Sequence, residues 1–548
     1  MSKISAALPV QDLGNGETRQ GFFDFQRDAI TFLQQKQQVI LADQPGLGKT
    51  LEILGTLEAA TLLERPGAIS LVLAPGLVAQ TAWKPIIDDF VADAYPNLRV
   101  VYAYTGTSAK KQKAVSEALA DTSTPLLIVA NHNAIDFKPG KPIRVPALLG
   151  PMYDAIIIDE AHLVLPTRVD AQAADRTQFW QGLAVLRHHP LQLRIPMSGT
   201  PFRGKLENIL GYYRFMQPTN PEYSSFWGWT MKHFRTYERI IDRRGRTALA
   251  IDQKPRNPLQ WIEMQQATVL RRTKLEVLKQ LPPKQYENIV LPMTPAMKQQ
   301  YEGYESALRL AADQRAEAGF EESAGYLDMK MYTRGRQLAT CRWEYAYDIS
   351  STGARSESGT PLMGKPEDAP KLEWILQFLR SRDADTVKVV ISSAFTGILE
   401  WLRESIVEYA PEYSAEVLSG STATGKREQI RESFQKGGLN VVLLSQAMGT
   451  GITLDAADDL ILTDIPNDPD VVEQVEDRVH RATSFNQVTI WRLMSEGTKD
   501  IEVVKKQDKT FARLRGITDS TRGVRESRKM LSPVSARQRR STGLEKNQ

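Results

Sequence analysis

Near its beginning the chain reads Leu41-Ala42-Asp43-Gln44-Pro45-Gly46-Leu47-Gly48-Lys49-Thr50. This stretch follows an apolar run and opens into a segment with helical spacing, which is the context of a phosphate-binding loop. Glycines such as Gly46 and Gly48 let backbone N–H groups turn toward phosphate oxygens, and the helix start adds positive potential. We expect Lys49 to reach the β- and γ-phosphates and the Thr50 hydroxyl to hold Mg²⁺. Because Asp43 replaces the first glycine of the strict pattern, an ordinary glycine turn before a helix stays open on this stretch alone.

A second stretch, Ala155-Ile156-Ile157-Ile158-Asp159-Glu160-Ala161-His162, is a buried strand that ends in two acids. An acid at the carboxyl end of a strand beside a phosphate loop can hold the Mg²⁺ shell, and we assign this role to Asp159. Glu160 is then placed to orient and deprotonate the attacking water. The alternative is an exposed acidic turn in which His162 only caps a helix.

A third stretch lies far along the chain and reads Gln474-Val475-Glu476-Asp477-Arg478-Val479-His480-Arg481. Arg478 and Arg481 are three residues apart, so on a helix they share a face. Two guanidiniums aimed together suit the charge that develops on a γ-phosphate during transfer. A helix of Glu, Asp and Arg is otherwise a solvated surface, and only its position after the two earlier stretches favours the catalytic interpretation.

Short apolar runs recur on either side of these stretches. They are Gln38–Leu41, Ser70–Ala74, Leu126–Ala130, Ala155–Ile158 and Leu193–Met197 in the first half, and Val387–Ile391, Asn440–Leu444, Leu460–Leu462 and Val488–Leu493 in the second. Continuous apolar runs with helical segments between them, such as Leu51–Leu63, predict parallel strands covered on both faces. The sequence therefore predicts two separate α/β units. Residues 220–345 are rich in Trp, Tyr, Arg, Lys and Gln, with helical patterning over 294–318, and predict helical insertions rather than a third sheet.

The apolar runs, the motifs and shifts in composition together suggest six parts of the chain. They are an N-terminal tail (1–20), a first lobe that binds ATP (21–215), helical insertions or a brace (216–349), a linker (350–370), a second lobe (371–515) and a basic tail (516–548). The linker is rich in Ser and Gly. The basic tail has the composition of a disordered segment, which either touches nucleic acid or is merely solvated.

Overall composition excludes several classes of protein. Of 548 residues, 42% are hydrophobic and 24% charged, which is typical of globular chains. No apolar run is long enough to cross a membrane, and the first residues lack the apolar core of a secretory signal. The single cysteine, Cys341, rules out an intrachain disulfide and a zinc site built on several thiolates. A net charge of +4 permits a polyanionic partner without requiring one.

Further short motifs occur in order along the chain. They are Gln26 within Phe25-Gln26-Arg27, Leu73-Ala74-Pro75 with Trp83, Ser198-Gly199-Thr200-Pro201, Leu270-Arg271-Arg272-Thr273-Lys274, Leu281-Pro282-Pro283-Lys284, Ser445–Leu454 and Asp464–Pro469. With these motifs the chain resembles the Swi/Snf-type DNA translocases of the superfamily-two nucleic-acid motors, over about residues 20 to 510. In that family an aspartate also replaces the first glycine of the loop. The Leu270–Lys274 and Leu281–Lys284 signature is not expected in generic RNA helicases.

The resemblance implies roles for further residues. Gln26 would read adenine, while Gly451 and Gln474 belong to motifs that meet the nucleotide. Ser198, Gly199 and Thr200, together with His162 of the Asp-Glu-x-His box, would couple nucleotide state to lobe movement. The chain departs from the family at Gln44-Pro45, where Glu-Met is usual, in the missing tryptophan of Asp464–Pro469, and in the missing Ile-Gly-Gln after Arg481.

The resemblance implies an α/β fold of two RecA-like parallel-sheet lobes with helical insertions between them. It implies an ATP- and Mg²⁺-dependent motor that moves on double-stranded DNA, with no membrane and with any recruiting protein unspecified. A strand-separating DNA or RNA helicase is one alternative, and a nucleotide-gated DNA-binding protein with little turnover is another. The compact chain favours the cytoplasm of a bacterial, phage or viral host, and a eukaryotic protein would act in the nucleus.

Two groups of residues stay ambiguous from sequence. One group could stack on or contact nucleic acid, although aromatics at this spacing more often pack an inserted helix. It comprises Trp227, Trp229, Lys232, His233 and Arg235. Ser392 and Ser393 close a strand of the second unit, where they would either meet DNA phosphates, as the resemblance implies, or cap the strand end.

Overall fold

The computed structural model describes most of the chain. The described residues are 2–12, 18–137, 143–168, 178–186, 193–202, 205–240, 247–278, 281–317, 331–349, 355–362, 364–446, 452–466, 468–481 and 487–518. They divide into two compact units, the first mainly Met1–Tyr237 with Ala250–Leu278 and the second mainly Lys279–Thr510. Among these residues, no helix is both long and apolar enough to cross a membrane.

The first unit is built on a parallel sheet with strand order β5-β6-β4-β7-β8. The sheet consists of β4 (Ile69–Ala74), β5 (Arg99–Ala103), β6 (Leu126–Asn131), β7 (Ala155–Ile158) and β8 (Leu193–Pro196). The unit also contains the short strands β3 (Ile40–Leu41) and β11 (Val269–Leu270), and a small hairpin of β1 (Val10–Asp12) and β2 (Thr18–Gln20). Its helices are α1 (Lys3–Ala7), α2 (Asp24–Lys36), α3 (Lys49–Ala59), α4 (Gly76–Val78), α5 (Lys84–Phe90), α6 (Ser108–Ala120), α7 (Gln178–Leu186), α8 (Ile209–Met216), α9 (Phe226–His233), α10 (Pro258–Thr268) and α11 (Lys274–Val277). Short β3 pairs in parallel with β11 and bridges to Met197 just after β8.

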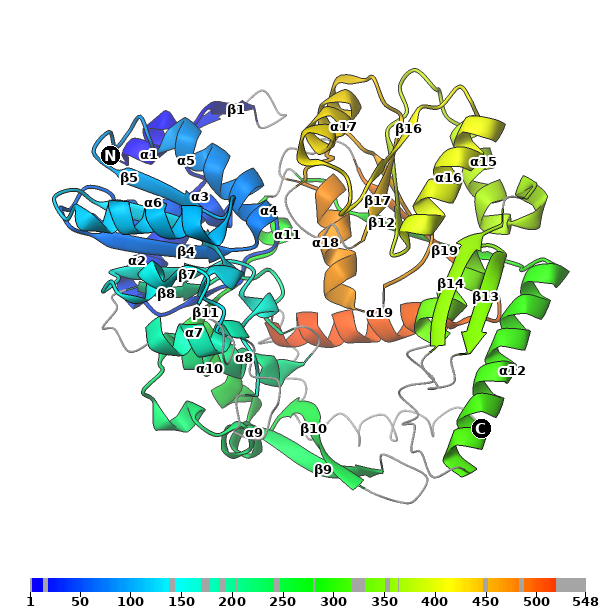
Figure 1. Ribbon diagram of the computed structural model, residues 1–548, viewed down its shortest axis with the longest axis horizontal. Helices are drawn as coiled ribbons and strands as arrows, with labels where there is room; N and C mark the ends of the chain where they lie inside the picture. Colours follow the sequence, from blue (N-terminus) through cyan, green and yellow to red (C-terminus); the bar gives the residue numbers. More distant parts are fainter. Residues whose placement is uncertain are drawn as a thin grey trace, which may run out of the picture. The chain divides into compact units, whose positions relative to one another are not determined.

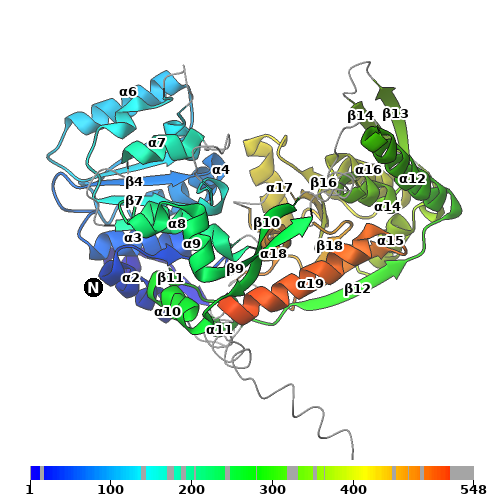
Figure 2. The same cartoon turned by 90° about the horizontal axis from the view of Figure 1, so that it is seen from below.

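Helices cover both faces of this sheet, as the continuous apolar runs predict. In Figure 2, α6 and α7 lie on one side of β4 and β7, and α2 and α3 lie on the other. Successive residues of β4 pack on opposite faces of the sheet. Leu71 and Leu73 belong to the core on the side of α7, whereas Val72 belongs to the core on the side of α3. The sheet is therefore buried between two helical layers.

The second unit repeats this plan with strand order β12-β19-β18-β15-β17-β16, all parallel. The sheet consists of β12 (Gln285–Leu291), β15 (Val389–Ser393), β16 (Ala415–Leu418), β17 (Val441–Ser445), β18 (Asp459–Leu462) and β19 (Thr489–Ser495). The unit also contains the strands β13 (Trp343–Ile349) and β14 (Arg355–Pro361). Its helices are α12 (Pro295–Glu317), α14 (Arg336–Thr340), α15 (Pro370–Arg380), α16 (Thr396–Tyr409), α17 (Thr424–Lys436), α18 (Pro469–Val479) and α19 (Lys499–Thr518). Figure 1 shows α17 and α18 on one side of the sheet and α15 and α16 on the other. Two parallel-sheet units with helices on both faces confirm the predicted fold class.

The segment expected to be helical, 216–349, contains strands as well as helices. Besides α9, α10 and α12 it holds β12, which is an edge strand of the second sheet, and the paired strands β9 (Phe234–Ile240) and β10 (Thr247–Pro255). The residues of β12 alternate between exposed and half-buried, because an edge strand tolerates polar side chains. Because β12 is polar in composition, the search for continuous apolar runs did not identify it as a strand.

Two other expected boundaries differ from the structure. The predicted linker at 350–370 includes β14, which pairs with β13 in antiparallel register from Trp343↔Pro361 to Ile349↔Arg355. The predicted N-terminal tail includes α1, whose Ile4 is buried in the core that contains α3. Most of the predicted basic tail, 519–548, lies outside the described residues.

The aromatic side chains of α9 pack inside the first unit. Trp229 is 1% exposed, and its ring lies 6.2 Å from that of Trp261 and 5.8 Å from that of Phe234. Trp227 is partly buried against the same core, with its ring 5.0 Å from Phe226. The packing alternative for these aromatics is therefore confirmed.

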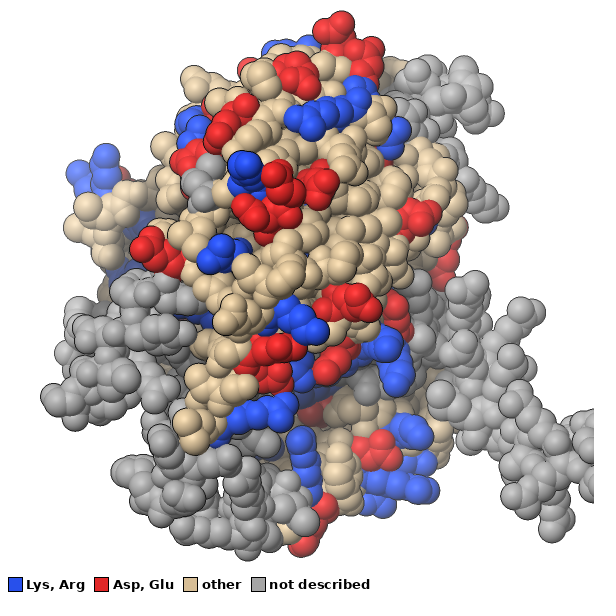
Figure 3. All heavy atoms as spheres, turned by 90° about the vertical axis from the view of Figure 1, so that its right-hand side faces the viewer, with Lys and Arg blue, Asp and Glu red and all other residues tan. Residues whose placement is uncertain are grey.

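Charges of both signs mix on the face of the second unit drawn in Figure 3. Exposed ion pairs one helical turn apart occur in this unit, including Arg403–Glu400 on α16, Lys436–Glu432 on α17 and Arg309–Glu305 on α12. Such exposed pairs contribute little to stability.

Candidate nucleotide site and arginine helix

The phosphate loop, residues 43–48, joins β3 to the start of α3. Gly46 and Gly48 have φ of 89° and 85°, a left-handed conformation that favours glycine. A Cβ on Gly48 would lie 2.5 Å from the Gln26 amide nitrogen, so a larger residue would also displace the Gln26 side chain. Lys49 and Thr50 begin α3, and the Lys49 ammonium donates to the Asp43 carbonyl at 2.8 Å. The loop geometry fits the predicted phosphate cradle.

Gln26 lies directly against this loop. Its side-chain nitrogen donates to the Leu47 carbonyl at 3.0 Å, and its side-chain oxygen accepts from the Phe23 N–H at 3.0 Å. Gln26 is only 4% exposed. The structure thus places it beside the loop, and its expected reading of adenine stays a prediction.

Asp43, the residue that replaces the first glycine, is fully buried and has a cationic partner. Arg272 donates to it from its backbone N–H at 2.8 Å and from its guanidinium Nε at 3.0 Å. The same guanidinium reaches Glu52 of α3 at 2.7 Å. Burial and the nearby Asp43 raise the pKa of Glu52, and the Arg272 charge opposes this rise. One arginine therefore serves two buried carboxyl groups under the loop.

The rest of the Leu270–Lys274 signature holds the loop through backbone contacts. Ala42 N–H donates to the Leu270 carbonyl at 2.7 Å, and the Arg271 guanidinium donates to the carbonyls of Ala42 at 3.1 Å and Gly199 at 2.7 Å. The unusual Gln44 accepts the Lys274 N–H with its side-chain oxygen at 2.7 Å. The signature therefore acts as a support for the phosphate loop, because β11 lies beside β3.

The acidic strand end lies at the carboxyl end of β7. Asp159 is 5% exposed and accepts the indole N–H of Trp83 at 2.9 Å and the Glu160 N–H at 2.8 Å. Burial raises the pKa of Asp159, and the Trp83 hydrogen bond works against this rise. Ring nitrogen Nε2 of His132 lies 2.8 Å from the Asp159 carbonyl oxygen, and burial lowers the pKa of His132 to about 4. The Thr50 hydroxyl and the Asp159 carboxylate are oxygen donors of the kind that Mg²⁺ prefers, so the residues fit this ion.

The Asp-Glu-x-His box meets the Ser-Gly-Thr-Pro motif. His162 Nδ1 lies 2.8 Å from the Ser198 hydroxyl and 3.3 Å from the Glu160 carboxylate. Ser198 in turn accepts the Thr200 N–H at 3.1 Å. Glu160 has φ of 45°, which is uncommon for a non-glycine residue. The structure brings together all the residues predicted for coupling, and the coupling itself stays a prediction.

In the second unit, α18 carries Gln474 and Arg478, with Arg481 two residues beyond its end. We call α18 through Arg481 the arginine helix. The guanidiniums of Arg478 and Arg481 both reach the Ile452 carbonyl at 3.4 Å, so they lie close together, although Arg481 follows the end of the helix that was expected to carry both. Gly451, the other predicted nucleotide contact of this unit, lies outside the described residues.

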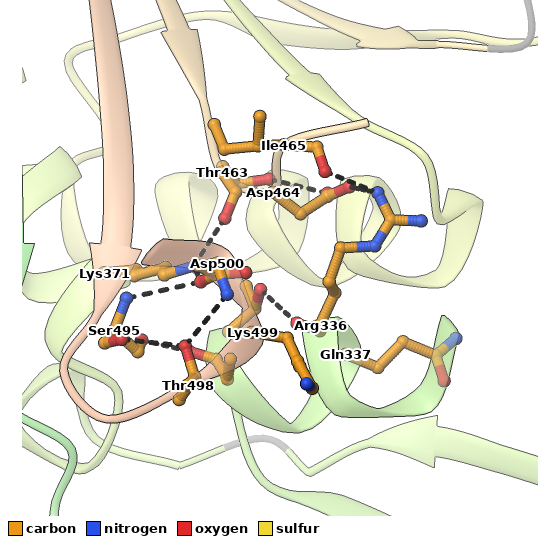
Figure 4. Close-up of polar contacts among 12 residues, drawn as sticks. Arg336, Gln337, Lys371, Thr463, Asp464, Ile465, Ser495, Thr498, Lys499 and Asp500 are labelled. Carbon is orange, nitrogen blue, oxygen red and sulfur yellow. Dashed lines mark hydrogen bonds and ion pairs between the residues drawn. The ribbon is translucent and has the colours of Figure 1, made fainter. Parts of the chain in front are cut away.

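Asp464 joins several motifs of the second unit. Its carboxylate accepts the Ser393 hydroxyl at 2.5 Å, and its carbonyl accepts the Gln446 amide at 2.9 Å. Figure 4 shows Arg336 reaching both the Asp464 carboxylate, at 3.5 Å, and the Ile465 carbonyl, at 2.8 Å. Ser392 is also buried and donates to the Leu444 carbonyl at 3.0 Å. Both serines are thus engaged inside the unit, which favours the strand-end alternative.

Sequence reasoning missed several partners of these residues. Trp83 and Arg272 stand in recognised motifs, but their contacts with Asp159 and Asp43 required the fold. His132 and the buried pair Lys371–Asp500, 2.7 Å apart in Figure 4, carry no sequence signal. Lys371 also donates to the Thr463 carbonyl at 2.7 Å, which ties α15 to the residue before Asp464.

Comparisons with known proteins match both units. The family described as SNF2-related domain matches residues 25–340, and the helicase conserved C-terminal domain matches residues 370–483. The ISWI chromatin-remodeling complex ATPase CHR17 of Arabidopsis thaliana is 25% identical over 476 residues, covering 86% of this chain and 40% of its own length. The DNA annealing helicase and endonuclease ZRANB3 of Bos taurus is 25% identical over 484 residues, covering 87% and 38%.

Among solved structures, the Sulfolobus solfataricus SWI2/SNF2 ATPase core in complex with dsDNA is similar at 19% identity, with a TM-score of 0.37 and coverage of 91% of this chain and 93% of that one. The chain spans 40% and 38% of the length of the two curated relatives.

Proposed function

Since the chain belongs to the SNF2-related family, we propose that it hydrolyses ATP with Mg²⁺ and uses the energy to move along double-stranded DNA, displacing or remodelling bound material. One observation carries the proposal. The phosphate loop, the acidic strand end and the Ser198 motif form a single hydrogen-bonded assembly that the Swi/Snf-type signature supports through Arg271 and Arg272.

In this proposal the first unit binds and activates the nucleotide. The Lys49 ammonium exchanges the Asp43 carbonyl for the β- and γ-phosphates, where its charge is needed. Thr50 and Asp159 hold Mg²⁺, which neutralises phosphate charge when bound. Glu160 orients the attacking water and accepts its proton. Gln26 contacts the adenine, as the family resemblance implies.

The second unit supplies positive charge for the transition state. The guanidiniums of Arg478 and Arg481 both reach the Ile452 carbonyl, so both can meet the charge that develops on the transferred phosphoryl group. Gly451 and Gln474 are proposed as further nucleotide contacts. The bond between His162 and Ser198 would transmit the state of Glu160 to the Ser198-Gly199-Thr200 motif and so to the lobe movement.

Double-stranded DNA is the proposed track. A motor that reads only phosphates and helix shape binds without sequence preference, and its affinity falls steeply with salt. The relatives named as chromatin-remodeling ATPases and as a DNA annealing helicase favour DNA over RNA. We propose action in the host cytoplasm for a bacterial, phage or viral chain and in the nucleus for a eukaryotic one, with any recruiting protein still to be identified.

Phosphate release measured with duplex DNA, single-stranded DNA and RNA side by side tests this function. We expect duplex DNA to stimulate turnover most. Lys49→Ala should weaken ATP binding and stop turnover, whereas Glu160→Gln should bind ATP and DNA normally and fail to hydrolyse. Stimulation mainly by RNA would favour the helicase alternative. Binding of duplex DNA with no turnover in the native chain would favour the nucleotide-gated alternative.

A further inference from the structure

The arginine helix carries two buried acids directly before its first arginine. Glu476 is 3% exposed and Asp477 is 1% exposed, so both carboxylates sit in an environment that penalises their charge. The negative charge of Asp477 also acts on Arg481, where it raises a pKa that burial lowers. Asp477 can therefore compete for the guanidinium of Arg481, which the reaction needs.

A lysine from a distant part of the sequence meets both acids. The Lys284 ammonium lies 2.9 Å from the Glu476 carboxylate and 3.3 Å from the Asp477 carboxylate. The Tyr286 hydroxyl donates to the same Glu476 oxygen at 2.8 Å. Burial disfavours the charge of Lys284, but Glu476 and Asp477 outweigh this effect and raise its pKa, so Lys284 remains charged.

The backbone around Lys284 fixes this contact in place. Tyr286 belongs to β12, which pairs with β19 in parallel register, and the Gln285 N–H donates to the Val488 carbonyl at 3.0 Å. Before the lysine, the Pro282 carbonyl lies 2.8 Å from His480 Nε2. We call Leu281–Tyr286 the lysine tether. Its contacts at positions 476, 477 and 480 bracket Arg478 and adjoin Arg481.

We propose that Lys284 is a positioning residue for ATP hydrolysis, which holds Asp477 together with Glu476 so that Arg481, beside Arg478, faces the nucleotide instead of Asp477. This inference rests on the proposed function, in which the two arginines stabilise the transferred phosphoryl group. It gives the Leu281–Lys284 half of the signature a task in the second unit that matches the task of the Leu270–Lys274 half in the first.

The test compares Lys284→Met, which keeps length and loses charge, with Lys284→Arg, which keeps charge. We expect Lys284→Met to lower DNA-stimulated kcat by about 10- to 100-fold with less than about 3-fold change in KM for ATP, because transition-state stabilisation is lost. Lys284→Arg should restore kcat to within about 5-fold of the native value, because the guanidinium also pairs with carboxylates.

Neutralising the acids distinguishes positioning from packing. Adding Glu476→Gln and Asp477→Asn to Lys284→Met removes the competing carboxylates and should recover at least about 5-fold of the lost kcat. A purely structural lysine would lower the free energy of unfolding but leave the kcat of the folded Lys284→Met chain at the native value, and that result would overturn the proposal. If Lys284→Met does not fold, Lys284→Arg and the triple variant still test the proposal. Both variants are expected to turn over ATP faster than Arg478→Ala, and a kcat as low as that of Arg478→Ala in either would overturn the proposal.

The same experiment separates failure of this inference from failure of the proposed function. Normal kcat in Lys284→Met, with kcat abolished in Arg478→Ala, would overturn the role of Lys284 alone. Normal kcat in Arg478→Ala and Arg481→Ala would instead remove the transition-state role of the arginines, on which the inference rests.

Discussion

At the scale of single residues, Asp43 shows how this chain departs from the strict phosphate loop without losing it. The carboxylate that replaces glycine is fully buried, and Arg272 neutralises it together with Glu52. The two contacts link residues 229 and 220 positions apart in the sequence. The aspartate is thus a structural part of the loop support.

Arg272→Met tests how much the contacts of Arg272 with Asp43 and Glu52 contribute to stability. The substitution leaves two buried carboxylates without their shared cation, and we expect a loss of about 3–5 kcal/mol in the free energy of unfolding of the first unit. Urea unfolding measures it. Arg403→Met, which breaks only exposed pairs, with Glu400 and Glu404, is the matched control and should cost less than about 1 kcal/mol. Equal losses in the two variants would show that Arg272 does not carry the loop.

His132 predicts a pH dependence of stability. The pKa of His132 is about 4 in the folded chain and 6.5 in its ordinary state. Between these pH values the unfolded chain binds a proton at His132 and the folded chain does not. The stabilisation is complete above about pH 6.5 and is lost as pH falls toward 4, amounting to about 2 kcal/mol between pH 7 and pH 5. Urea midpoints of native chain and His132→Gln should therefore converge on acidification. A constant difference across this range would contradict the assignment.

Single residues also mark the limit of sequence reasoning. Lys49, Thr50, Asp159 and Glu160 were identified from local spacing, because a phosphate loop and an acidic strand end have fixed local patterns. The partner of Asp43 was not, since it depends on the parallel pairing of β11 with β3. A contact created by topology leaves no local pattern.

At the scale of elements, continuous apolar runs located the buried strands well. The runs at 126–130 and 155–158 became β6 and β7 with little change in their bounds, because both faces of these strands are covered. The edge strand β12 was missed, because only one side of an edge strand has a neighbour and its side chains stay polar. The apolar pattern of the sequence therefore indicates burial more directly than it indicates secondary structure.

The arginine helix yields the prediction that belongs to this scale. If Arg478 and Arg481 act together from one face, Arg478→Ala or Arg481→Ala should lower kcat toward the range of about 10³- to 10⁵-fold seen for arginine fingers. KM for ATP should change far less, because binding in the ground state is not what is removed. Steady-state kinetics with saturating duplex DNA provides the measurement. A variant with raised KM and native kcat would identify the pair as a ground-state phosphate contact.

At the scale of the whole molecule, the two α/β units divide the chemistry. The first holds the phosphate loop and the acidic strand end, and the second holds the arginine helix. The signature between residues 270 and 284 contacts the phosphate loop in the first unit and the arginine helix in the second. In the proposed function, hydrolysis uses residues of both units, which is the basis for a motor that moves as ATP turns over.

Displacement of a third strand from duplex DNA tests the central claim most directly. The substrate is a duplex with an oligonucleotide bound in its major groove, and a forked duplex without a third strand serves as the comparison. The account predicts that the native chain strips the third strand only with ATP and Mg²⁺, that Glu160→Gln does not, and that the fork stays paired. Efficient opening of the fork while the third strand remains bound would contradict translocation on double-stranded DNA and establish a strand-separating helicase instead.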